Sequence, residues 1–361
     1  MGEKIYMVGA HSRAQTAAEY IRCLYPGTEV EAYLYDNEET NPRMIGTVPV
    51  IRMDETAKLN PSCPVYIGTR AIYHEKLAAR LKKSGFRKIC PITPELDTKL
   101  RNAYIRNYYT HNGRNFLKLE ELKPAKERSS TGTEPMVYVV RSAFDKVLKS
   151  RYGLAAYEKE IQAGAAQAGE CLRPGILRDD KGENISAKNR QYCELTVLYW
   201  LWKHAEEETV GMVHYRRHFI LPEDWFIRMQ DNEVDVILPV PLYVAPNVEG
   251  NFKKRHDPAV WEFMMDCLKK QSPEEYQEAE VFFHKNLYSP CNMFIMKKEI
   301  LDVLCNWLFP VLFQVTEHMG ERADSYQNRY PGFLSERLIS FFFEKNRKKY
   351  KTVYADKNFL P

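Results

Sequence analysis

The chain has 361 residues, of which 44% are hydrophobic and 28% charged, so it can form more than one ordinary globular core. Its net charge of +4 is small for a nucleic-acid-binding protein, which normally carries a strongly basic stripe. Its eight cysteines are scattered without a Cys-x-x-Cys pair, which argues against a zinc knuckle or a disulfide framework.

The sequence shows no targeting signal. The N-terminal residues lack the apolar core of a signal peptide. No apolar run approaches the ~20 residues of a membrane helix, and the longest candidate, residues 304–313, is interrupted by Asn306 and Pro310. We therefore expect a cytoplasmic enzyme or binding protein with reduced, largely buried thiols.

The first part of the chain alternates short apolar segments with helical ones. We expect strands at residues 4–10, 30–35, 48–51, 64–68 and 88–92, and helices at 14–24 and 71–84. Strands that alternate with helices predict a parallel, doubly wound α/β sheet. Residues 1–94 are therefore predicted to form a Rossmann-like domain.

The first turn of this domain, residues 9–14, is a degenerate dinucleotide fingerprint in which Gly9 is the first glycine and the second is missing. Asp36 falls about where a ribose-binding acid would lie. The signal for NAD binding is weak, and a structural or nucleotide-sensing role is the alternative. The catalytic Tyr-x-x-x-Lys pattern of nucleotide-sugar oxidoreductases is missing around Tyr104–Tyr109.

A polar segment, residues 95–135, predicts a helix followed by a linker that includes residues 128–133. A second α/β pattern then covers residues 136–361. We expect strands at 136–141, 160–165, 209–214, 235–239 and 292–296, a turn or short helix at 144–150, and helices at 189–204, 300–313 and 334–345.

The strand at 209–214 runs directly into His214, Tyr215, Arg216 and Arg217. Two adjacent guanidiniums suit a phosphate or diphosphate, because each can donate bidentate hydrogen bonds. The alternative is a solvated strand end whose arginines pair with surface carboxylates.

Three other polar segments lie at strand ends or helix starts. The first is the loop of residues 179–186, rich in Asp, Glu and Asn, which suits a hard cation or sugar hydroxyls but also a surface loop that caps a helix through Ser186. The second delivers Asn292 to the start of a strand. The third places Glu336 in a first helical turn, where a carboxylate suits either general-base chemistry or helix capping. Because strand ends share one crevice in open α/β sheets, we expect all four segments to converge.

In order, these segments resemble a family of bacterial exopolysaccharide and capsule biosynthesis proteins. The motifs are Gly-Glu-Asn-Ile-Ser, Gly-x-x-His-Tyr-Arg-Arg, Asp-Val-Ile-Leu-Pro, Asn-Met-Phe-Ile-Met and Gly-Phe-Leu-Ser-Glu-Arg-Leu, spread from about residue 136 to the end. That family was long catalogued as a domain of unknown function and is regarded as glycosyltransferase. The resemblance implies a GT-A-like fold for residues 136–361, a nucleotide-sugar donor and a glycan acceptor.

This interpretation gives each candidate residue a role. His214, Tyr215, Arg216 and Arg217 would bind the donor diphosphate, and Glu336 would be the catalytic base of an inverting enzyme. The residues expected to contact the donor or the acceptor are Asp180, Glu183, Asn184, Asn189 and Asn292.

The metal requirement is open. Many GT-A enzymes hold Mn²⁺ or Mg²⁺ on an Asp-x-Asp motif after a central strand, where this chain has His214–Arg217. Arginines can stabilise a leaving diphosphate in place of a metal, so no cofactor is certain and a divalent ion is compatible.

The acceptor is expected to be a polysaccharide or a lipid-linked oligosaccharide, and the protein is not expected to bind nucleic acid. Residues 341–351 combine three phenylalanines with a basic run, which suits contact with the inner face of the plasma membrane or, alternatively, a solvated helix end. The rival functions are a nucleotide-sugar oxidoreductase or epimerase that uses the N-terminal domain, and a non-catalytic glycan- or nucleotide-binding partner.

Overall fold

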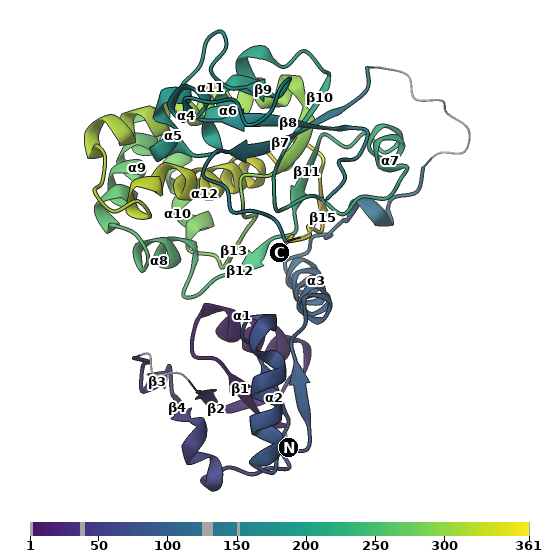
Figure 1. Ribbon diagram of the computed structural model, residues 1–361, viewed down its shortest axis with the longest axis vertical. Coiled ribbons are helices and arrows are strands. Elements are labelled where there is room, and N and C mark those ends of the chain that lie inside the picture. The colour runs from purple at the N-terminus through teal and green to yellow at the C-terminus, as the bar shows by residue number, and fades with distance from the viewer. Residues whose placement is uncertain (1–2, 37–39, 125–132, 150–151, 361) are drawn as a thin grey trace. The chain divides into compact units, whose positions relative to one another are not determined.

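The computed structural model of the chain describes residues 3–36, 40–124, 133–149 and 152–360 (Figure 1). It divides into two compact units, unit 1 (residues 1–116) and unit 2 (residues 117–361). The division falls within the segment 95–135 that the sequence predicts to hold a helix and a linker. Residues 128–132 of that linker lie outside the described residues.

Unit 1 has a central sheet with helices beside it. Its strands are β1 (Lys4–Val8), β2 (Glu29–Tyr35), β3 (Met44–Ile45), β4 (Val48–Arg52), β5 (Val65–Ile67) and β6 (Ile89–Pro91). Its helices are α1 (Ser12–Leu24), α2 (His74–Lys83) and α3 (Pro94–His111), with 3-10 turns η1 (Met53–Lys58) and η2 (Ala71–Tyr73).

The sheet of unit 1 follows the order β3-β4-β2-β1-β5-β6, and all neighbours except β3 and β4 are parallel. Numbered along the chain, its parallel strands lie in the order 3-2-1-4-5 of doubly wound sheets. Tyr6 and Val8 pack with Leu81 of α2. A Cβ on Gly9, which follows β1, or on Gly68, which follows β5, would lie 3.1 or 2.9 Å from the Cβ of Ala14, so these glycines let α1 approach the sheet closely.

Unit 2 is the larger α/β unit (Figure 1). Its strands are β7 (Met136–Ser142), β8 (Glu158–Ala163), β9 (Leu177–Arg178), β10 (Thr209–His214), β11 (Val236–Pro239), β12 (Leu242–Tyr243), β13 (Leu287–Tyr288), β14 (Phe294–Lys297) and β15 (Thr352–Ala355). Its helices are α4 (Ala165–Ala168), α5 (Asn189–Tyr192), α6 (Leu195–His204), α7 (Trp225–Asp231), α8 (Val248–Lys253), α9 (Pro258–Gln271), α10 (Pro273–Phe283), α11 (Lys298–Met319) and α12 (Tyr330–Lys345). Three 3-10 turns join them: η3 (Leu119–Glu121), η4 (Ser186–Lys188) and η5 (Gln327–Arg329).

The main sheet of unit 2 has the order β15-β11-β14-β10-β7-β8-β9. Strand β14 runs antiparallel to both of its neighbours, β10 and β11, whereas the other neighbouring strands are parallel. Unit 2 has a mixed α/β architecture and unit 1 has a mainly parallel sheet. Together these two observations confirm the predicted fold class.

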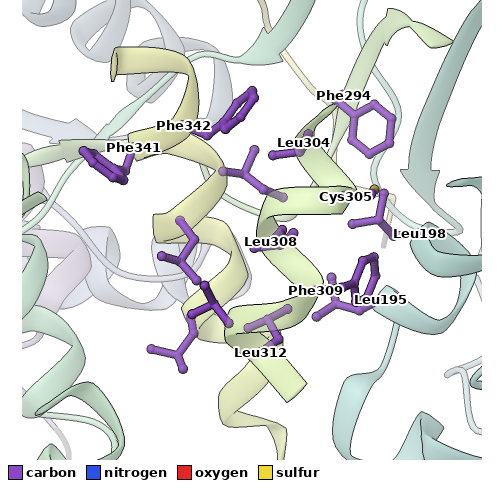
Figure 2. Close-up of a cluster of buried hydrophobic side chains, with 14 of the residues drawn as sticks. Leu195, Leu198, Phe294, Leu304, Cys305, Leu308, Phe309, Leu312, Phe341 and Phe342 are labelled. Carbon is purple, nitrogen blue, oxygen red and sulfur yellow. The ribbon is translucent and has the colours of Figure 1, made fainter. Parts of the chain in front are cut away.

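The two faces of this sheet belong to separate hydrophobic clusters, because successive side chains of a strand point to opposite faces. In β7, Tyr138 belongs to the larger cluster, with α6 and α9 to α12, and Val139 to the smaller one, with α7. Figure 2 shows how α11 fills the larger cluster: side chains such as Leu308 lie between those of α6 and those of α12. A core of this size holds the strand ends in fixed positions.

By length and composition alone, α11 is apolar enough to cross a membrane, and it is the single helix among the described residues that meets this test. Its apolar residues are used inside unit 2, where nine of them are buried. The same holds for Phe341, Phe342 and Phe343 of α12, which are buried in the larger core. The prediction that these aromatics contact a membrane was therefore wrong.

The helix predicted over residues 189–204 is in fact two helices, α5 and α6. The break lies at Cys193, whose φ of 50° and ψ of −127° are incompatible with a continuing helix. The break turns Glu194 away from the regular path and toward the end of β10, where the candidate site lies.

Candidate active site

The sheet of unit 2 brings several chain segments to one edge. Strands β7, β8, β9 and β10 are parallel, so their carboxyl ends share that edge. Because β14 runs the opposite way, the turn that precedes it lies at the same edge. His214 ends β10 and Asn292 lies two residues before β14, so the topology places both residues together.

A hydrogen-bonded path joins His214 to Glu336 through the backbone of Cys291. His214 Nε2 donates to the Cys291 carbonyl oxygen at 2.5 Å, and the Cys291 N–H donates to Glu336 Oε1 at 2.8 Å. Glu336 Oε2 accepts from Nη1 of the buried Arg337 at 2.9 Å. Both carboxylate oxygens are therefore fixed in position.

Asn292 forms a second connection in the site. Its Nδ2 donates to Glu194 Oε1 at 2.8 Å and to the Gly332 carbonyl at 3.0 Å, and its Oδ1 accepts from Ser335 Oγ at 2.8 Å. This buried amide thereby ties the start of α6 to the start of α12. Among the described residues, no further hydrogen bond reaches the carboxylate of Glu194.

The backbone of the site is strained. Four described non-glycine residues have positive φ, and three of them lie here: Cys193 at 50°, Cys291 at 79° and Asn292 at 50°. Such conformations cost about 1–3 kcal/mol each and cluster at functional sites. Their grouping around His214 and Glu336 makes this edge of the sheet the candidate site.

Charged groups surround His214. Burial lowers the pKa of this imidazole; the nearby Glu194 carboxylate opposes the shift, and the guanidiniums of Arg217 and Arg329 add to it. His214 is therefore neutral near pH 7, with its Nε2 proton held by the Cys291 carbonyl.

Burial acts in the opposite direction on Glu336. It raises the pKa of this carboxyl, while Arg337, the Cys291 N–H and Arg217 oppose the shift. The side chain keeps 15% of its surface exposed, so it can still meet a ligand. A partly desolvated carboxylate with a raised pKa is a stronger base than one in water.

Residues 214–217 form a tight turn, in which the His214 N–H donates to the Arg217 carbonyl and the Arg217 N–H to the His214 carbonyl. Tyr215 Oη accepts from the Lys146 N–H at 3.2 Å. Arg216 Nε donates to the Leu360 carbonyl at 3.0 Å, and both arginines lie over the ring of Phe359.

Neither Arg216 nor Arg217 forms an ion pair with an acidic residue of the described chain. Both side chains are nevertheless half-buried. The alternative in which these arginines pair with surface carboxylates is therefore not what the described residues show. Arg216 acts on the Asp145 carboxyl and Arg217 on the Glu336 carboxyl without a described ion pair. Two such partly desolvated guanidiniums form a favourable environment for an anion.

The loop that begins at Asp179 has a structural role at its centre. The carboxylate of Asp179 is fully buried and accepts hydrogen bonds from the N–H groups of Gly164 and Ala165 and from the hydroxyls of Ser186 and Thr196. These bonds fix the segments that follow β8 and β9.

The predicted donor-site residues of this loop have local partners. Asp180 pairs with Arg178 at 2.6 Å, and Glu183 accepts from Tyr199 at 2.7 Å and pairs with Lys203 at 3.0 Å. Asn184 donates to the Gly182 carbonyl, and Asn189 donates to the Cys193 carbonyl at 2.8 Å. Of these four, Asn189 directly contacts the strained junction beside Glu194, whereas no described hydrogen bond or ion pair joins the other three to His214 or Glu336.

Sequence reasoning gave no individual role to three residues of the site, Glu194, Arg329 and Asp145, although Glu194 belonged to the polar segment considered for a cation or sugar. Glu194 lies at the end of the polar segment and binds Asn292, and Arg329 Nε donates to Cys193 Sγ at 3.1 Å. Asp145 lies after β7, and burial raises its pKa to about 6. The signal for Glu194 was its place beside a helix break, which the helical periodicity of residues 189–204 concealed.

No group of three or more His, Cys, Asp or Glu side chains within the described ranges is placed to hold a metal ion. Glu336 is engaged by Arg337, and the acidic residues of the 179–186 loop have the partners given above. The described side chains therefore do not fit the acidic metal site that many GT-A enzymes have.

The mixed sheet gives unit 2 an α/β fold that is similar to the fold of a solved glycosyltransferase. Residues 149–347 match the family described as "Domain of unknown function (DUF4422)", and the chain belongs to that family.

Among solved structures, the apo structure of the bifunctional glycosyltransferase WbbM is similar in fold, with a TM-score of 0.54 and 24% sequence identity. The similarity covers 63% of this chain and 45% of the WbbM chain, so it extends over less than half of that protein. A second alignment is to core-mannan synthase A (CmsA/Ktr4) from Aspergillus fumigatus in its Mn/GDP form. It covers 100% of this chain and 75% of that chain at 8% identity, but its TM-score of 0.27 is too low to indicate a shared fold. No curated protein sequence is similar enough to this chain to be matched with it.

Proposed function

We propose that this protein is a glycosyltransferase that moves a sugar from a nucleoside-diphosphate sugar to a polysaccharide or lipid-linked oligosaccharide. One observation carries the proposal: half-buried Arg216 and Arg217, which form no described ion pair, follow His214 in a strained site at the carboxyl edge of the sheet. The two guanidiniums favour an anionic ligand, and a diphosphate matches them in charge and geometry.

In the proposed reaction, the bond between the donor sugar and its diphosphate breaks as the acceptor hydroxyl attacks the sugar. Arg217 and Arg329, which both act on His214, stabilise the negative charge that develops on the leaving diphosphate. Arg216, which lies over the same Phe359 ring as Arg217, binds the same group.

Glu336 is the proposed base in an inverting reaction, because it is held by two hydrogen bonds, partly desolvated and still accessible. It removes the proton of the acceptor hydroxyl as the glycosidic bond forms. Glu194 accepts a hydrogen bond from Asn292 and so holds this amide in position within the site. In a retaining reaction, no such base is needed and Glu336 binds the sugar instead.

The charge of the diphosphate and the cellular place of the reaction complete the proposal. The arginines stabilise the charge of the diphosphate, and the assay with and without Mn²⁺ measures any contribution of a divalent ion. We place the reaction in exopolysaccharide, capsule or O-antigen biosynthesis, in the cytoplasm at the inner face of the plasma membrane, where lipid-linked acceptors reside.

The proposal predicts specific nucleotide binding. Thermal shift with a panel of nucleoside diphosphates and nucleotide sugars, with and without Mn²⁺, is expected to raise the Tm by about 5–10 °C at ligand concentrations far above Kd. The shift is lost in Arg216→Ala/Arg217→Ala and kept in the control Arg347→Ala, which removes an exposed arginine paired with Glu344. A shift that persists in the double variant, or no shift with any nucleotide, contradicts the proposal.

The parallel sheet of unit 1 favours one second candidate, a nucleotide-dependent oxidoreductase or epimerase. Gly9, with φ at +112°, and Ala14 meet two requirements of a dinucleotide turn, but His11 occupies the place of the second glycine. Asp36, the expected ribose ligand, instead lies 3.7 Å from Arg80. Stabilisation by NAD(H) alone in the same panel would favour this candidate.

A further inference from the structure

An unusually exposed apolar segment lies at the carboxyl end of β7. It comprises residues 143–149, here called the β7 loop, in which Phe144 is 73% exposed and Val147 is 94% exposed. Large apolar side chains this exposed normally have a partner when they occur close together.

The first half of this loop is fixed by hydrogen bonds to the end of β7. The Asp145 carboxylate accepts from the Ser142 N–H at 2.8 Å, the Asp145 N–H donates to the Ser142 carbonyl at 3.1 Å, and the Phe144 N–H donates to Ser142 Oγ at 3.3 Å. The backbone therefore holds Phe144 in its outward position.

The loop also adjoins the candidate active site. The Lys146 N–H donates to Tyr215 Oη, and Tyr215 directly precedes Arg216. The guanidinium of Arg216 in turn lies 4.6 Å from the ring of Phe359, another exposed aromatic. Exposed apolar side chains therefore occur in two segments that contact residues 215 and 216, the β7 loop and the segment of Phe359.

The charges of the loop select one kind of partner. Two exposed lysines, Lys146 and Lys149, alternate with Phe144 and Val147, while the single acidic residue, Asp145, is half-buried. Exposed apolar groups interleaved with lysines match the interface of an anionic bilayer, where the apolar groups enter the headgroup region and the lysines meet acidic lipids.

We infer that the β7 loop docks this protein on an anionic membrane surface, with the proposed active site facing the acceptor headgroups. The identity of the acceptor rests on the proposed function, whereas membrane binding does not. Docking would confine the search for a lipid-linked acceptor to two dimensions and place its sugar beside Arg216 and Glu336.

The test is sedimentation of the full chain with vesicles of phosphatidylcholine containing about one third phosphatidylglycerol, compared with pure phosphatidylcholine. The wild type is expected to bind the anionic vesicles and to lose binding at high salt. Phe144→Ser/Val147→Ser and, separately, Lys146→Glu/Lys149→Glu are expected to weaken binding by about tenfold or more.

The matched control is Val281→Ser, which removes an apolar side chain of α10 that is 65% exposed, and which is expected to bind vesicles like the wild type. All variants are first checked for an unchanged Tm. The inference is overturned if the wild type does not bind anionic vesicles, or if the loop variants bind them as well as Val281→Ser does. Either result overturns it even if the loop is then found to bind a protein partner.

Nucleotide binding, measured by thermal shift on the same variants, separates this inference from the proposed function. Vesicle binding without any nucleotide effect would support the membrane-docking inference and contradict the proposed transferase function. Nucleotide effects without vesicle binding would do the reverse.

Discussion

Glu336 and Glu194 are two carboxylates of the candidate site that differ in their hydrogen bonds. Glu336 is fixed through both oxygens and is near the surface, whereas Glu194 is bound through one oxygen to Asn292. Replacement by glutamine keeps the shape of each side chain and removes its basicity, so the two variants separate proton transfer from positioning.

For an inverting reaction, Glu336→Gln is expected to lower kcat by about 10²–10⁴-fold with the nucleotide sugar that binds, because the acceptor hydroxyl loses its base. Glu194→Gln keeps the Asn292 contact possible and is expected to cost about tenfold. Product formation is measured by chromatography, with the exposed Glu299→Gln as control. A larger loss in Glu194→Gln would move the base to Glu194, and an unchanged rate in Glu336→Gln would leave that residue a binding role.

The raised pKa of Glu336 predicts the pH dependence of the same reaction. A base acts only when deprotonated, so kcat is expected to rise with pH through a value above that of an ordinary glutamate, since burial is the main cause of the shift. The effect on stability has the opposite sign: the folded state binds this proton more tightly than the unfolded state, so stability falls between the unfolded and the folded pKa. A profile whose acid limb stays in place in Glu336→Gln, measured with its residual activity, would exclude Glu336 as the titrating group.

The residues at strand ends were accessible from the sequence, because an apolar run that stops at a polar residue marks both the strand and its edge. His214 and Asn292 were found in this way, and their contact follows from the direction of β14. The pairing of Glu194 with Asn292, 98 positions apart, depends on tertiary packing that no local pattern encodes. Asp180 and Glu183 illustrate the reverse case, since polar loops carry many side chains that only satisfy one another.

Among the elements, the junction of α5 and α6 matters most for the site. The residues on both sides have strong helical patterns, so the sequence predicts one helix, yet packing stops α5 after one turn at Cys193. The φ and ψ of Cys193, 50° and −127°, belong to a region that glycine adopts far more readily than other residues. Strain at this position holds Glu194 toward Asn292.

A comparison of Cys193→Gly with Cys193→Ala isolates this strain, because both variants lose the sulfur and its contact with Arg329. We expect the glycine variant to be more stable than the alanine variant by about 1 kcal/mol, measured by urea unfolding, since glycine tolerates this backbone conformation. The glycine variant should also bind nucleotide less tightly, because the junction is freer to relax. Equal stability of the two variants would show that the junction is not strained.

At the scale of the whole molecule, the chain combines two α/β units whose cores are formed by different residues, Leu81 for example in unit 1 and Leu308 in unit 2. The alternation of strands and helices made the central strands of both sheets predictable, whereas the edge strands β3, β9 and β15 and the helices α9 and α10 were not predicted. Separate cores imply that each unit can unfold as its own cooperative transition, and that a ligand stabilises the unit that binds it.

Calorimetry of the full chain is therefore expected to resolve two transitions. Leu81→Ala should lower one and Leu308→Ala the other, each by the equivalent of about 2–5 kcal/mol, because each substitution leaves a cavity in one core. A nucleoside diphosphate should raise the transition that Leu308→Ala lowers, since Arg216 and Arg217 belong to unit 2. If the nucleotide instead raises the transition sensitive to Leu81→Ala, the binding site lies in unit 1 and the oxidoreductase candidate gains. A single transition that both variants lower alike would mean that the two cores are energetically coupled.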